Sequence, residues 1–240
     1  MVNAQLHRDI RKVSTRARAK ISQSFFKTGV GEYGEGGRFL GTTVPDLRKL
    51  SVKYQGLPPS DLVPLLKSRW HEERLLALII LVRQYERGDH AARQAIYRLY
   101  LAHTRYINNW DLVDASADAI VGAYLYDRDR ALLHKLAQSR SVWERRIAML
   151  ASFHYIKKGE YEDALTIAEL LLRDEHDLIH KAVGWMLREI GKRDQAVEER
   201  FLRTHAARMP RTMLRYAVER FPGPLRRRYL SARGGRLRGA

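Results

Sequence analysis

Helical periodicity runs through almost the whole sequence, and no segment alternates apolar and polar residues convincingly enough to predict a strand. In the stretch HDLIHKAVGWMLREIGK, a turn of about 100° per residue places Ile179, Val183, Met186 and Ile190 on one face of a helix. A chain of 240 residues with this pattern is long enough to bury a substantial core. The sequence therefore predicts an all-α fold.

Residues typical of helix ends recur along the chain. Helix starts are expected at Thr43, Ser60, Asn109 and Ser141, the last in a capping box with Glu144, and helix ends at Gly88, Gly159 and Gly191. Long helices are expected to begin near Trp70, Asn109, Ser141 and Asp177, roughly 30 to 40 residues apart, with a further helical segment between them. This spacing predicts a HEAT-like solenoid of stacked helix pairs with a concave, basic face.

The chain is expected to form one domain over residues 1–225. Residues 226–240 continue as a basic, glycine-containing tail within LRRRYLSARGGRLRGA, which we expect to be flexible.

The composition is strongly basic. Forty-four Lys and Arg residues against 27 Asp and Glu give a net charge of +17, which indicates a polyanionic partner, with nucleic acid favoured over a merely solvated basic surface. The sequence has no cysteine, which excludes disulfides, iron–sulfur clusters and thiolate zinc sites. The longest apolar run, LLALIILV from Leu75, is too short to span a membrane, and the N-terminus lacks a signal-peptide pattern. We expect a cytoplasmic protein with no membrane association, cofactor or metal.

A basic stripe lies opposite the apolar face of the helix around residues 177–191. It contains Lys181, Trp185, Arg188 and Lys192. A flat indole among cations suits a sugar or base whose phosphates the cations bind. The alternative is that Trp185 packs on a neighbouring helix beneath lysine side chains.

The stretch YINNWDLVDASADAIVGAYL is interpreted as one helix. Its projection groups Trp110 and Asp114 with Ala117 and Val121. A second, small-residue face suited to close packing contains Leu112, Ser116, Ala119 and Ala123. Asp111 is explained by the helix dipole, because it lies in the first turn, and Asp118 by a salt bridge. Asp114 lies beyond that turn, so the dipole does not explain it. Either Asp114 forms a structural salt bridge, for example to Arg146, or it has a chemical role.

Asp114 suggests a specific chemistry. A carboxylate near a bound nucleotide opposes phosphate binding, but it stabilises the positive charge that develops at C1′ when a glycosidic bond breaks. A base that is already cationic, such as an N-alkylated purine, needs no general acid to leave.

Four segments resemble the AlkD-type family of DNA alkylation repair glycosylases: YGEGGRFLGTTVPDLRKL, NNWDLVDASA, WERRIAML and HKAVGWMLREIGK. The resemblance implies a HEAT-like fold and monofunctional hydrolysis of cationic alkylpurines, such as 3-methyladenine and 7-methylguanine, in double-stranded DNA. It also implies that the enzyme works as a base excision repair glycosylase without a base-flipping pocket. We expect a monomer.

The resemblance assigns roles to individual residues. Asp114 resembles the catalytic carboxylate, Trp110 and Trp185 resemble the indoles that flank the deoxyribose, and Arg146 resembles a phosphate-binding arginine. Arg188 lies in the same motif as a further DNA contact, and Lys181 and Lys192 share its stripe. Thr43 and His154 stand where the family is expected to have a glutamine and a lysine that contact DNA, so the contacts there are expected to differ.

Two other functions fit parts of this pattern. A non-catalytic HEAT-like module could bind damaged or branched nucleic acid, but it would have little need of Asp114 and both tryptophans. A protein-binding scaffold would need no basic stripe around Trp185. The glycine-rich GVGEYGEGG lacks the Lys-Ser/Thr ending of a phosphate-binding loop and follows no strand.

Overall fold

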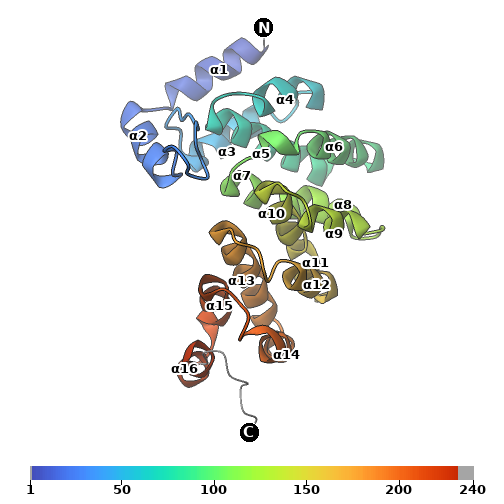
Figure 1. Ribbon diagram of the computed structural model, residues 1–240. Helices are drawn as coiled ribbons and strands as arrows, with labels where there is room; N and C mark the ends of the chain where they lie inside the picture. Colours follow the sequence, from blue (N-terminus) through green and yellow to red (C-terminus); the bar gives the residue numbers. More distant parts are fainter. Residues whose placement is uncertain (1, 232–240) are drawn as a thin grey trace. The chain divides into compact units, whose positions relative to one another are not determined.

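The computed structural model describes residues 2–231, without the side chains of residues 2 and 3, and over this range the fold is an all-α helical repeat, as predicted (Figure 1). No β-strand forms among these residues; an isolated bridge joins Arg38 to Trp70. The first helices are α1 (Val2–Lys12), α2 (Arg16–Phe25), α3 (Val44–Lys53), α4 (Pro59–Leu66), α5 (His71–Arg87), α6 (His90–Ala102), η1 (Thr104–Tyr106), α7 (Trp110–Asp114), η2 (Asp118–Gly122) and α8 (Ala123–Leu125). The others are α9 (Ala131–Ala137), α10 (Val142–Ala151), α11 (Phe153–Ile156), α12 (Glu162–Leu170), α13 (Asp177–Gly191), α14 (Gln195–His205), α15 (Arg211–Ala217), η3 (Val218–Arg220) and α16 (Gly223–Ser231).

The chain divides into two compact units, Met1–Tyr124 and Leu125–Ala240. The single domain expected over residues 1–225 stays a prediction. Among the described helices, none combines the length and apolar character that crossing a membrane requires.

Helix α5 forms the centre of the first unit. It packs against α3, α4 and α6, and its apolar run from Leu75 to Leu81 is almost entirely buried. Each fully buried leucine or isoleucine contributes roughly 1.5–3 kcal/mol relative to an exposed one. The apolar segment noted in the sequence is therefore the core of this unit.

Helix α1 buries Leu6 and Ile10, and one carboxylate also attaches it to α3. Asp9 accepts hydrogen bonds from Lys53 Nζ at 2.5 Å and from the Tyr54 hydroxyl at 2.7 Å. The Lys53 hydrogen bond, followed by that of Tyr54, lowers the pKa of Asp9 to about 2. Asp9 therefore remains ionised, and the attachment intact, over most of the acidic range.

Glu72, at the start of α5, organises the loop before α3. Its carboxylate accepts backbone hydrogen bonds from Leu40 at 2.8 Å, from Gly41 at 2.7 Å and from Thr42 at 3.3 Å. Gly41 has a φ of +84°, and a Cβ there would overlap the carbonyl oxygen of Thr15 and come within 2.6 Å of Ala19 N. The backbone of α2 therefore rests directly on Gly41, a contact that only glycine allows.

Two of the expected N-caps are confirmed. The Thr43 hydroxyl accepts the Asp46 N–H at 3.3 Å, and the Asn109 side chain accepts the Trp110 N–H at 2.8 Å. The expected cap at Ser60 is wrong, because α4 already begins at Pro59, whose fixed φ and missing N–H suit the first turn. Ser141 occupies the N-cap of α10 but makes no side-chain cap.

The expected helix ends are partly confirmed. Gly88 follows α5 and donates its N–H to Gln84 O at 2.8 Å. Gly159, with a φ of +83°, lies in the turn after α11. Gly191 is the last residue of α13 rather than the residue beyond it, and Lys192 is the C-cap.

Helix α13 forms the centre of the second unit, where it packs against α10, α14 and α15. Ile179, Val183, Met186 and Ile190 are all fully buried, so the predicted apolar face is confirmed. A Cβ on Gly184 would lie 2.5 Å from Tyr216 Cβ, which shows how closely α13 and α15 approach.

The expected tail from residue 226 overlaps α16. Pro224 lies in the first turn of this helix, where proline is favoured, and Tyr229 is buried. Residues 226–231 are therefore helical, and the rest of the expected tail, 232–240, lies outside the described residues.

Candidate functional site

The stretch 106–125 is not the single helix that the sequence predicts. Helix α7 ends at Asp114, and the π-helix η2 begins at Asp118. A π turn holds more residues than an α turn and so rotates the following side chains away from the expected face. The turn at residues 115–116 already interrupts the helix before Ala117, and the π-helix follows it; Ala117 and Val121 are fully buried and do not share an exposed face with Trp110 and Asp114.

Trp110 belongs to an aromatic cluster at the start of α7. Its ring stacks on Phe26 with centroids 5.3 Å apart and meets the edge of Phe25 at 5.8 Å. Phe26 in turn stacks on Phe39 and lies against His71. Trp110 is half-buried, so the cluster holds the indole in place while part of it stays accessible.

Asp111 is paired with a buried histidine. Its Oδ2 lies 2.7 Å from His71 Nε2, and its Oδ1 accepts the Leu112 N–H at 3.0 Å. His71 is only 2% exposed, and its Nδ1 has no hydrogen-bond partner within residues 2–231. Asp111 therefore lies in the first turn, as the dipole interpretation requires, but it also joins α7 to α5.

Asp114 lies at the end of α7 and is half-buried, and its charge acts on the buried Tyr100. Burial raises the pKa of Tyr100, and the negative charges of Asp114 and Asp118 raise it further. The Tyr100 hydroxyl lies 3.1 Å from Ser116 Oγ, which also donates to Leu112 O at 2.6 Å. This buried network supports the turn that follows Asp114.

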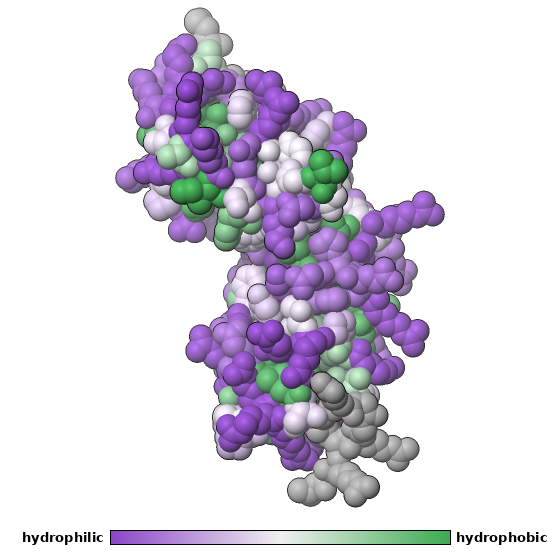
Figure 2. All heavy atoms as spheres, turned by 60° about the vertical axis from the view of Figure 1, so that its left-hand side comes forward, coloured by the Kyte–Doolittle hydropathy of each residue, from purple (hydrophilic) through white to green (hydrophobic). Residues whose placement is uncertain are grey.

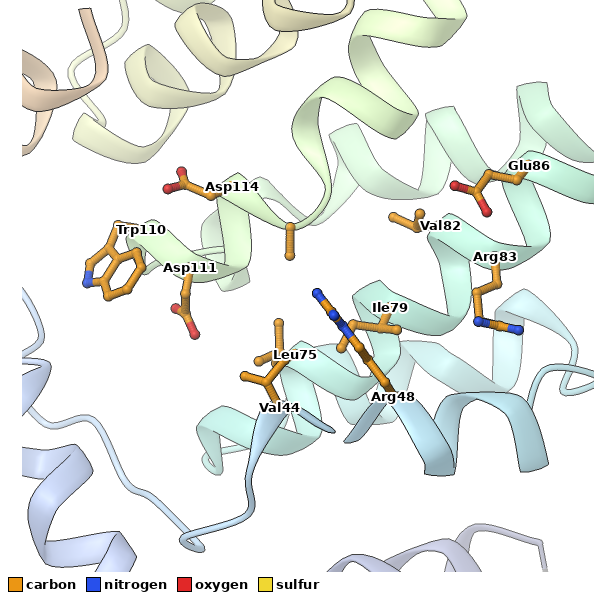
Figure 3. Close-up of a pocket in the computed structure, with 11 residues that line it drawn as sticks. Val44, Arg48, Leu75, Ile79, Val82, Arg83, Glu86, Trp110, Asp111 and Asp114 are labelled. Atoms are coloured by element: carbon orange, nitrogen blue, oxygen red, sulfur yellow. The ribbon is translucent and has the colours of Figure 1, made fainter. Parts of the chain in front are cut away.

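A hollow of about 480 Å³ lies beside Asp114 in the first unit (Figure 3). Its lining residues are Val44, Arg48, Leu75, Ile79, Val82, Arg83, Glu86, Trp110, Asp111, Asp114 and Ala115. In Figure 3, Arg48 extends from α3 toward the hollow, and Trp110, Asp111 and Asp114 border it from α7. The hollow therefore has an apolar floor, a carboxylate side and an arginine side.

Sequence reasoning missed Arg48 and Arg83. Each lies four residues after an apolar lining residue on the same helix, Val44 on α3 and Ile79 on α5. That spacing places each arginine on the same helix face as its apolar neighbour. This helical spacing was the signal that could have identified both residues.

In the second unit, Trp185 is half-buried on α13. Its Nε1–H donates to Glu189 Oε1 at 3.2 Å, and its ring lies 6.0 Å from that of Phe153. Glu189 also accepts from Lys192 at 2.5 Å and from Arg193 at 3.1 Å. Burial would raise the pKa of Glu189, but these cationic hydrogen bonds outweigh it and lower the pKa.

The other predicted cations on α13 also have acidic neighbours. Lys181 lies 2.7 Å from Asp177, and Arg188 forms an ion pair with Glu219. Acids therefore offset the charge of the basic stripe.

The three remaining predicted DNA contacts are placed as follows. Arg146 is only 4% exposed and donates to Leu178 O at 2.6 Å. His154 meets the ring of Tyr126 edge-on, with centroids 5.5 Å apart. The Thr43 hydroxyl, besides capping α3, donates to Asp46 Oδ2 at 2.6 Å.

The structure brings two of the predicted residues together and distributes the others. Trp110 and Asp114 share α7 and the hollow of the first unit. The second unit holds the rest except Thr43: Arg146, His154, Lys181, Trp185, Arg188 and Lys192.

Comparison with known proteins identifies one family. The sequence profile of a family described as "DNA alkylation repair enzyme" matches residues 6–221. A solved structure, a predicted DNA alkylation repair enzyme from Enterococcus faecalis, is similar with a TM-score of 0.67 at 16% identity, over 88% of this chain and 97% of that one. At this identity the likeness shows a shared fold. No curated protein matches the chain.

Proposed function

The chain belongs to the family of DNA alkylation repair enzymes, and from that premise we propose that it is a monofunctional DNA glycosylase. Its substrates would be cationic N3- or N7-alkylated purines in double-stranded DNA, such as 3-methyladenine and 7-methylguanine. The role in DNA alkylation repair follows from the family; the glycosylase reaction is the proposal.

One observation carries this proposal: Trp110 and Asp114 border the same hollow, one turn apart on a helix anchored at Asp111. An indole face can lie against a deoxyribose, and a carboxylate one turn away can face its C1′.

The proposed reaction needs few groups. The C1′–N bond breaks and its electron pair neutralises the cationic base, which therefore leaves without a general acid. The Asp114 carboxylate stabilises the positive charge that develops at C1′ and orients a water molecule, whose oxygen bonds to C1′ while one of its protons passes to the solvent. Selectivity would come from the lability of the cationic lesion and not from an enclosed base pocket. The arginine side of the hollow supports this, since Arg48 and Arg83 would repel a cationic base and attract phosphate.

The second unit would supply the remaining contacts. We propose Trp185 as the second indole against the sugar, and Arg146, Lys181, Arg188 and Lys192 as phosphate contacts, with Thr43 and His154 at the periphery. Arg146 is only 4% exposed and is fixed on Leu178 O, so it would meet a phosphate through its small accessible edge, at little cost in ordering entropy. The cations on α13 would exchange their acidic partners for phosphate.

The test is single-turnover release of base from a duplex that contains one 7-methylguanine, with wild type and Asp114→Asn compared. The proposal expects release by the wild type, and release slower by at least about 100-fold in the variant at equal DNA affinity. Duplex binding by both proteins with no release by either would instead support a non-catalytic module. The expected monomeric state and the expected cytoplasmic location stay predictions. Sedimentation would test the first and cell fractionation the second.

A further inference from the structure

Helix α2 buries none of its side chains, although two of them are large and apolar. Ile21 is 69% exposed and Phe25 is 63% exposed. Most of the helix is held through its backbone, which rests on Gly41, and the Gly41 N–H is bound by Glu72. Only at its C-terminal end does a side chain, Phe25, pack against the rings of Phe26 and Trp110. Helices in a stacked fold normally turn an apolar face inward, so a helix fixed by its backbone leaves its side chains available to a partner.

The charge of this segment indicates the chemistry of that partner. From Lys12 to Thr28 the sequence has five cations and no acidic residue. Arg16, Arg18, Lys20 and Lys27 are exposed, and within residues 2–231 their side chains form no ion pair or hydrogen bond. The cations of α13 have acidic neighbours, whereas those of α2 would lose no protein ion pair on meeting phosphate.

The loop after α2 adds an exposed apolar tip. Val30 is 94% exposed between two glycines. Glu32 accepts the N–H of Gly29 at 2.8 Å, and Glu35 accepts that of Gly31 at 3.0 Å. Both carboxylates are therefore bound to the loop's own backbone, and the valine projects at the tip. Figure 2, turned to bring the α2 side of Figure 1 forward, shows apolar green atoms exposed among hydrophilic purple ones at this end of the chain.

This surface is continuous with the candidate site. The C-terminal end of α2 carries Phe25, which meets the edge of Trp110, and the next residue, Phe26, stacks on the same indole. A duplex with a nucleotide at Trp110 therefore has its neighbouring backbone within reach of α2.

We propose that Arg16, Arg18, Lys20, Ile21, Lys27 and Val30, here called the α2 surface, form a second contact with duplex DNA beyond the lesion. The cations bind phosphates along the backbone, and Ile21 and Val30 lie against the sugars and base edges of the groove between them. The inference rests on the proposed DNA-binding function. The inference predicts that the bound protein covers a longer stretch of duplex than contacts at the lesion alone would require.

The test compares two triple variants for binding to an undamaged duplex at several salt concentrations. The first is Arg16→Gln, Arg18→Gln, Lys20→Gln. The matched control, Lys67→Gln, Arg87→Gln, Arg98→Gln, removes the same charge from exposed positions on the same unit. We expect the α2 variant to lower the slope of log affinity against log salt by about 2 to 3, and the control to change it by less than about 1. Ile21→Ser with Val30→Ser should weaken binding several-fold with the slope unchanged.

If the two triple variants lower the slope of log affinity against log salt equally, the inference is overturned, because the change then depends only on the net charge of the protein. A loss of binding to anionic phosphatidylserine vesicles, with DNA binding intact, would overturn it in favour of a membrane surface. Base release by the wild type is measured in parallel. A wild type that binds DNA through α2 but releases no base would refute the glycosylase proposal and leave the α2 surface standing.

Discussion

His71 Nε2 lies 2.7 Å from Asp111 Oδ2, and this contact joins two helices through residues that are 40 positions apart in the sequence. The histidine comes from the first turn of α5 and the aspartate from the first turn of α7. Because Trp110 precedes Asp111 and Asp114 follows it by one turn, the pair fixes the helix that carries two of the three residues proposed to act at the sugar.

Replacing His71 with Asn should slow base release by about 10- to 100-fold, because small displacements of reacting groups are costly. Undamaged-duplex affinity should change little, since the buried His71 is paired with Asp111 and is not among the proposed phosphate contacts. Single-turnover release and anisotropy measure the two effects. Asp111→Asn should slow release similarly, and His205→Asn, in the other unit, serves as the control. An unchanged rate in both His71 and Asp111 variants would show that the pair has no positioning role.

Replacing Glu189 with Gln should strengthen binding to undamaged duplex several-fold at low salt. The carboxylate now holds Lys192 and Arg193, and its loss would leave both cations available to phosphate. The control is Glu162→Gln on α12, which removes one negative charge from an exposed position. If both variants bind equally tightly, the gain reflects net charge and α13 does not contact DNA.

The buried Glu198 should make stability fall as the pH rises. Burial raises the pKa of Glu198 to about 9, with Glu199 adding to the effect, whereas the unfolded value is 4.5. Between these values the folded state binds more protons than the unfolded state, so the free energy of unfolding decreases by up to about 1.4 kcal/mol per pH unit. Urea unfolding from pH 5 to 9 should show this slope, and Glu198→Gln should flatten it. An equal slope in both proteins would assign the pH dependence to other groups.

Replacing Gly41 with Ala should destabilise the protein by roughly 2–4 kcal/mol, because the position combines a positive φ with a direct clash against α2. Gly56→Ala, where a Cβ would meet nothing within 4 Å, is the matched control. Chemical denaturation measures both. A Gly41 variant as stable as the control would mean that α2 is not held by this backbone contact.

The sequence predicts the regular helices well and the irregular ones poorly. The face of Ile179, Val183, Met186 and Ile190 is confirmed because α13 is a regular α-helix in which a 3.6-residue period applies throughout. The same projection fails after Asp114, because apolar spacing gives no warning of a π turn.

Charge pairing was only partly predictable. The Asp177–Lys181 and Glu189–Lys192 pairs follow helical spacings visible in the sequence. Arg188 and Glu219 are 31 residues apart, and their pairing depends on how α13 packs against the segment after α15. The His71–Asp111 pair is hidden in the same way, because it depends on a tertiary contact. The catalytic and DNA-binding roles of the named residues stay predictions.

Because α2 is attached largely through its backbone, the position of the helix does not depend on which side chains it exposes. Gly41 and the carboxylate of Glu72 fix where the helix lies, and neither depends on which side chains point outward from it. Residues at positions such as 18 and 21 are therefore free to vary without unfolding the unit. If α2 contacts DNA as proposed, this helix is a place where the range of DNA structures bound by the protein can change while the proposed catalytic residues beside it stay the same.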